Sequence, residues 1–230
     1  MKRPVVDYRE LRLSNINELR FRHVKLLLGW VGYFVLYFLT ENLIPAERCT
    51  PIHCRLDDLI PFNEYFSIAY CFWYVLLFFS LLYYFLYDTK RFADLQTYII
   101  ITQVVAMACY IAFPSRQDLR PEEFTRDNFF THVMASIYSF DTSTGVCPSL
   151  HVAYSLGIAS VWRKDPNASR LWKAFVIVAA ALICVSICFV KQHSAVDAFA
   201  ALPVCLLAEG IVYGKSYWLP RLKAARATRR

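Results

Sequence analysis

The chain has 230 residues, of which 57% are hydrophobic, with a mean hydropathy of +0.36 and a formal net charge of +7. This composition excludes an ordinary water-soluble domain, because several apolar runs approach the roughly 20 residues that cross a bilayer. We therefore expect an all-α, polytopic membrane protein with one transmembrane domain, since helices satisfy their own backbone hydrogen bonds in lipid.

Residues 1–25 form a basic N-terminal segment without the short apolar core of a cleavable signal peptide. Apolar side chains between Tyr8 and Leu19 fall roughly on one side of a helix drawn over residues 7–22. This spacing predicts a basic amphipathic helix on the cytoplasmic membrane surface. A solvated tail is an equally open interpretation.

The transmembrane domain is expected over residues 26–214, followed by a basic, disordered cytoplasmic tail over residues 215–230. Six apolar windows predict spanning helices, the fourth being short: Leu26–Leu43, Tyr65–Tyr87, Phe92–Phe113, Leu150–Val161, Leu171–Val190 and Ala195–Tyr213. Most of the 25 lysines and arginines lie on the side that holds both termini. The positive-inside rule then places both termini in the cytoplasm of a plasma or inner membrane, and the net charge needs no nucleic-acid partner.

Two outer loops carry further features. Cys49 and Cys54 share one loop, where a disulfide and two separate thiols are equally open interpretations. A zinc site that adds His53 is disfavoured, because the spacing matches no common zinc pattern. The long segment 125–143 has apolar residues at near-helical spacing, which predicts a helix along the outer membrane surface. Its His132 is interpreted as an interfacial residue, with a third active-site imidazole as the alternative.

Three polar clusters fall at the outer ends of the predicted helices. They are FPSRQDLRPEEF at 113–124, CPSLHVAY at 147–154 and KQHSAVD at 191–197. Ionisable residues at such depths are costly, so they indicate a functional site.

His193 and Asp197 are four residues apart and therefore share one face of a helix. A carboxylate there fixes the imidazole tautomer and leaves the other ring nitrogen as base or nucleophile. The structural alternative is a His–Asp pair that only ties two helices together.

Pro148 and Ser149 are typical of a helix start, and His151 follows in the first turn. Backbone N–H groups at a helix start bind phosphate well, and the Ser149 hydroxyl adds a donor. A capped helix with a buried, hydrogen-bonded histidine is the structural alternative.

Three cations lie on the same side, namely Arg116, Arg120 and Lys191, and such groups bind phosphate oxygens. For Arg116 an ion pair with Asp118 or Glu122 is the favoured interpretation.

Two histidines, a carboxylate and cations together predict phosphoryl transfer. A metal site of two histidines and one carboxylate is the rival, but the added positive charge opposes it, so we expect no metal and no other cofactor.

At this point the motifs resemble a known family. Pro148-Ser149-Leu150-His151 and His193-xxx-Asp197, on successive outer helix ends, are similar to motifs of the type 2 phosphatidic acid phosphatase (PAP2) superfamily. Arg120-Pro121 resembles the end of the family's first motif. The resemblance covers roughly residues 90–215.

The resemblance implies a six-helix bundle and a metal-independent enzyme. It implies His193 as the nucleophile that forms a phosphohistidine, Asp197 as its orienting group and His151 as the acid for the leaving group. Ser149 and Arg120 would hold phosphate oxygens.

The chain departs from the family pattern at three positions. Phe113 stands where the first motif has lysine, Leu150 where the second has glycine, and Ile187 where the third has arginine. Arg116 and Lys191 are the candidate replacements for the two missing cations.

The expected function is an integral membrane lipid phosphatase that hydrolyses a phosphomonoester or diphosphate headgroup at the outer leaflet. The PSLH motif also looks like the lipid phosphotransferase branch, which includes inositol phosphorylceramide synthase-like proteins, where an alcohol replaces water. A non-catalytic lipid-binding or transport protein is a further alternative. The expected partners are a phosphorylated lipid and the bilayer.

Overall fold

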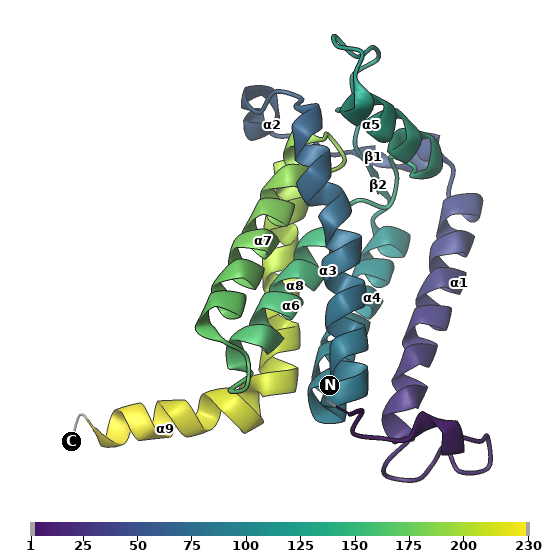
Figure 1. The fold of residues 1–230 in the computed structure, drawn as a ribbon. Coiled ribbons are helices and arrows are strands. Elements are labelled where there is room, and N and C mark those ends of the chain that lie inside the picture. Colours follow the sequence, from purple (N-terminus) through teal and green to yellow (C-terminus); the bar gives the residue numbers. More distant parts are fainter. Residues whose placement is uncertain (1–2, 229–230) are drawn as a thin grey trace.

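A computed structural model gives the fold and describes residues 3–228. Long helices pack into one bundle, and the strands in this range, β1 (Thr50–Pro51) and β2 (Ser115–Arg116), form a two-residue parallel pair (Figure 1). The all-α prediction is therefore confirmed.

Five helical segments are long and apolar enough to cross a membrane. They are Arg22–Leu43, Glu64–Tyr87, Thr89–Ala112, Arg170–Phe189 and Ala195–Ala227. The helices within them are α1 (Leu28–Leu43), α3 (Ser67–Tyr87), α4 (Thr89–Ala112), α7 (Arg170–Phe189) and α8 (Ala195–Tyr213). They correspond to five of the six predicted windows, and they support an integral membrane protein.

The fourth window forms a shorter helix, α6 (Leu150–Lys164), which falls outside that group. Its 15 residues extend about 22 Å, less than the roughly 30 Å hydrocarbon core of a bilayer. Most of α6 is buried among α3, α4, α7 and α8, so its surface faces protein and need not match the length of a lipid-facing span.

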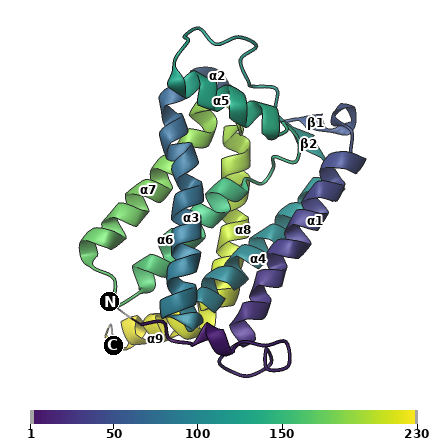
Figure 2. The same ribbon diagram turned by 45° about the vertical axis from the view of Figure 1, so that its right-hand side comes forward.

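Close packing of α6 on α4 depends on a glycine. A Cβ atom added to Gly157 would lie 2.6 Å from the ring of Tyr98, which is buried. By contrast, α1 buries none of its residues completely and packs on α4 at the edge of the bundle (Figure 2).

The helix predicted over residues 7–22 does not form. The segment contains a 3₁₀ turn at Tyr8–Glu10, further turns and a second 3₁₀ helix at Arg22–Leu27. Asn15 bonds the backbone of Arg12 and Glu10, and such side-chain bonds compete with a helix. The Tyr8 hydroxyl donates to the Phe85 carbonyl at 2.5 Å, which ties this segment to the end of α3.

The C-terminal tail was expected to be disordered, but its described part is helical. A π-helical turn at Gly214–Trp218 leads into α9 (Leu219–Ala227), and residues 229–230 of the predicted tail lie outside the described residues. The N-terminal segment and α9 lie at the same end of the bundle (Figure 1).

Two short helices cover the opposite end of the bundle (Figure 2). α5 (Phe129–Phe140) confirms the helix predicted within residues 125–143. α2 (Arg55–Leu59) follows Cys54, which is a free thiol, as is Cys49, so the two do not form a disulfide. His53 instead pairs with Asp58 at 2.7 Å.

Candidate active site

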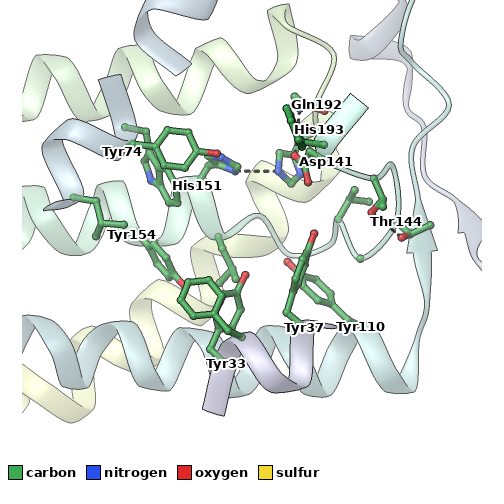
Figure 3. A pocket seen from close by; sticks show the side chains of 18 of the residues that line it. Tyr33, Tyr37, Tyr74, Tyr110, Asp141, Thr144, His151, Tyr154, Gln192 and His193 are labelled. Atoms are coloured by element: carbon green, nitrogen blue, oxygen red, sulfur yellow. Dashed lines mark hydrogen bonds between the residues drawn. The ribbon is translucent and has the colours of Figure 1, made fainter. Parts of the chain in front are cut away.

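A cavity of about 420 Å³ is lined by residues of α1, α3, α4 and α6 and by the loop that follows α5 (Figure 3). Aromatic side chains form much of its wall: Trp30, Tyr33, Phe34, Tyr37, Trp73, Tyr74, Tyr110, Phe140 and Tyr154. Both predicted catalytic histidines, His151 and His193, line the same cavity.

The two histidines and Asp197 form a continuous chain of contacts. The distance from His193 Nδ1 to Asp197 Oδ2 is 3.2 Å, and that from His193 Nε2 to His151 Nδ1 is 3.3 Å. Asp197 is fully buried. A carboxylate beside Nδ1 favours the tautomer that carries its proton there, so Nε2 is the nitrogen that faces His151 and the cavity.

The turn between α7 and α8 fixes His193. α7 ends at Phe189, and Lys191 adopts a left-handed backbone conformation with φ of 51°, which is uncommon for a residue other than glycine. Ser194 then caps α8, and its backbone N–H donates to Asp197 Oδ2 at 3.0 Å. The carboxylate that contacts His193 therefore also closes the first turn of its own helix.

Asp57 in α2 braces the same turn, and its role was not predicted. Its carboxylate accepts hydrogen bonds from Ser194 Oγ at 2.6 Å and from the Ala195 N–H at 2.8 Å. Burial raises the pKa of Asp57, but these bonds and those from Cys54 outweigh it, so the pKa lies below its usual value. Asp57 is therefore held as a carboxylate at neutral pH.

Ser149 lies where predicted but is occupied as a helix cap. Its Oγ accepts from the Val152 N–H at 3.5 Å, and its own N–H donates to the Asp197 carbonyl at 3.1 Å. Ser149 thus joins the start of α6 to the start of α8, which brings His151 to His193.

Arg120 links two segments that line the cavity, the loop after α5 and the turn that contains His193. Its guanidinium donates to the carbonyls of Asp141 and Thr142, both at 2.9 Å, and to Gln192 Oε1 at 2.6 Å. It also lies over the ring of Tyr138, 4.6 Å from the ring centroid. These contacts fix the loop after α5 against the histidine turn.

The other two predicted phosphate ligands are placed elsewhere. The Lys191 ammonium donates to the carbonyls of Asp57 at 2.9 Å and Ile60 at 2.5 Å, and the residue is buried. Arg116 contacts Asp118 at 3.2 Å and the Ala46 carbonyl at 3.2 Å. Neither side chain lines the cavity, so the interpretation of Arg116 as an ion pair is the one the geometry favours.

Asp141 and Gln192 line the cavity beside His193 and were not predicted as site residues. Gln192 Nε2 donates to Asp141 Oδ2 at 3.2 Å. Burial raises the pKa of Asp141, although His193, Arg120 and a hydrogen bond from Tyr37 oppose the rise. Asp141 follows a predicted helix without any motif, so no pattern in the sequence marks it.

His132 is remote from this group. It is exposed and pairs with Asp127 at 2.7 Å. This position matches the interfacial interpretation.

Within the described residues, no group of three or more histidine, cysteine, aspartate or glutamate side chains is arranged to hold a metal ion.

A second, almost wholly apolar hollow of about 570 Å³ adjoins the cavity between α1 and α3. The two share four lining residues: Trp30, Phe34, Tyr74 and Leu77. The hollow therefore lies beside the cavity, between two helices that belong to candidate membrane spans.

Comparisons of the chain with protein families, curated proteins and solved structures gave no match. Its function is therefore inferred from the motifs and from the geometry of the cavity.

Proposed function

We propose that the protein is an integral membrane enzyme that cleaves a lipid phosphate through a phosphohistidine on His193. The observation that carries this proposal is the contact between His193 Nε2 and His151 Nδ1 in one cavity, with Asp197 behind His193. The resemblance to the type 2 phosphatidic acid phosphatase superfamily supports the same roles.

In the proposed first step, His193 Nε2 attacks phosphorus while the bond from phosphorus to the leaving oxygen breaks. His151 gives its proton to that oxygen, because a neutral alcohol leaves more readily than an alkoxide. Asp197 stabilises the charge that develops on the His193 ring. In the second step an acceptor O–H attacks phosphorus, the bond to Nε2 breaks, and the acceptor proton returns to His151.

The apolar hollow between α1 and α3 supports a lipid substrate. Its walls offer carbon surface to acyl or isoprenyl chains, and it shares four lining residues with the cavity that holds the histidines. A soluble phosphate ester would leave this surface uncovered.

With water as the acceptor the enzyme is a lipid phosphatase, and with an alcohol it is a phosphotransferase. Asp141 and Gln192 beside His193 favour the second candidate, because they offer hydrogen-bond partners to an acceptor hydroxyl.

We further propose that α6 completes a six-span bundle, with both termini cytoplasmic and the histidines toward the outer side.

The test is a lipid panel with the purified protein, in which both free phosphate and new headgroup-bearing lipids are measured. We expect His193→Ala to abolish turnover and the alkali-stable phosphoenzyme, whereas the exposed His132→Ala variant keeps both. Full turnover by His193→Ala would exclude the proposed nucleophile. Lipid binding without any turnover by the unmodified protein would instead favour a lipid-binding or transport role.

A further inference from the structure

The cavity carries an unusual charge for a site that receives phosphate. Among the residues of 3–228 that line it, Asp141 is the only acidic or basic side chain apart from the histidines. The two terminal nitrogens of Arg120 donate to backbone carbonyls and to Gln192, and its buried Nε has no hydrogen-bond partner among the described residues. A dianionic phosphate at His193 would therefore meet a carboxylate in a poorly solvated space.

Some aromatic rings of the wall already pack on one another or on His151. Trp30 stacks with Phe34 at a centroid distance of 5.9 Å, and the Trp73 ring lies 5.7 Å from that of Tyr154 and 4.4 Å from that of His151. Figure 3 shows Tyr33 and Tyr37 across the cavity from the imidazole pair, and Trp30, Trp73 and Tyr74 complete the wall. In the described part of the chain, the cation–ring contacts all involve rings outside the cavity. Aromatic faces beside a carboxylate are the chemistry that recognises a quaternary ammonium group.

We propose that the cavity selects a zwitterionic phosphodiester lipid with a choline-type headgroup, whose ammonium lies between Asp141 and the rings of Tyr33 and Tyr37. This inference rests on the proposed function and specifies its substrate class. The ammonium supplies the positive charge that the protein does not place in the cavity, and a cation beside Asp141 favours the ionised form of this buried carboxyl group.

The reaction then transfers the whole headgroup. His193 Nε2 bonds to phosphorus as the bond from phosphorus to the glycerol oxygen breaks, and that oxygen takes the proton of His151 and leaves as diacylglycerol. The phosphocholine group passes from His193 to the oxygen of water or an alcohol, whose proton returns to His151. The released diacylglycerol keeps its chains in the hollow between α1 and α3.

The test separates headgroup selection from turnover. Short-chain phosphatidylcholine, phosphatidylglycerol and phosphatidic acid are titrated into the purified protein, with the fluorescence of Trp30 and Trp73 as the signal. The inactive His193→Ala variant is titrated in parallel, so that cleavage does not deplete the lipid. Free phosphocholine serves as a further probe, because weak binding of it would show that the lipid tails contribute.

We expect phosphatidylcholine to bind about tenfold more tightly than phosphatidylglycerol, which has the same phosphodiester charge but no ammonium. Asp141→Asn should abolish this difference, and Tyr33→Leu should reduce it. Asp127→Asn, the same change on an exposed carboxylate near the other end of α5, should leave it unchanged.

Equal binding of the two phosphodiesters, tighter binding of phosphatidic acid, or an unchanged preference in Asp141→Asn would overturn the inference. Turnover of phosphatidic acid that depends on His193, without a choline preference, would leave the proposed function in place. A choline preference without turnover of any lipid would refute the proposed function and retain the headgroup site.

Discussion

Asp57 shows how a single side chain outside the reacting group can control it. Its carboxylate bonds the hydroxyl of Ser194 and the N–H of Ala195, the residues that follow His193. The backbone carbonyl of Asp57 also accepts from Lys191. One residue of α2 thus holds both sides of the turn that contains His193.

We expect Asp57→Ala to destabilise the protein by about 2 kcal/mol or more, because it leaves buried donors unpaired. The lowered pKa of Asp57 means that its contribution to stability is present above the unfolded-state pKa and is lost as pH falls through the folded-state value. Melting temperature in detergent between pH 7 and pH 3 measures this loss. Asp58→Ala is the control, since Asp58 is exposed and its side chain bonds His53, and this variant should melt like the unmodified protein.

The contact of His193 with Asp197 could be predicted from their i, i+4 spacing, which is a local property. The contact of His151 with His193 spans 42 residues, and its prediction depended on placing both residues at helix ends on the same side of the bundle. The sequence did not predict where the cations point. Lys191 lies two residues from His193, but its left-handed backbone directs the ammonium to carbonyls of the α2 region. Such tertiary partners, like Asp141, are set by loop conformations that no motif encodes.

At the scale of elements, α6 and α4 approach closely because position 157 has no side chain. We expect Gly157→Ala to lower stability by about 1–3 kcal/mol, since the added methyl group would press on the buried Tyr98 ring. Gly210→Ala in α8 is the matched control, because no atom lies within 4 Å of the position that its methyl group would take. It should be neutral or gain up to about 1 kcal/mol from helix propensity.

Both variants are compared by thermal melting in the same detergent. Equal melting temperatures for Gly157→Ala and the unmodified protein would show that the α4–α6 contact tolerates expansion.

Apolar windows predicted the long helices well, because lipid-facing helices must be apolar along their whole length. They were least informative for α6, which is enclosed by other helices and obeys packing constraints instead. Helical spacing was misleading for the N-terminal segment, where side-chain bonds of Asn15 and the docking of Tyr8 on α3 replace a regular helix.

At the scale of the whole molecule, the fold makes a prediction about membrane topology. The two ends of the chain lie at one end of the bundle, and α2 and α5 lie at the other (Figure 1). We expect an epitope fused after the C-terminus to be reached only after the membrane is permeabilised, because the proposed topology has the basic termini in the cytoplasm. An epitope inserted in the exposed turn near Asp127 should be accessible in intact cells. Accessibility of both epitopes from the same side would contradict a six-span bundle.

The short length of α6 has a consequence for the physical path of the substrate. α6 begins deeper in the bundle than α7 ends (Figure 2), and at about 1.5 Å per residue it is about 8 Å shorter than α7. His151 is in its first turn, so the proposed cleavage would take place deeper in the bundle than the end of α7. The headgroup of a lipid substrate would therefore have to enter the protein and lose its bound water before it reacts, and the product headgroup would be hydrated again only after it leaves.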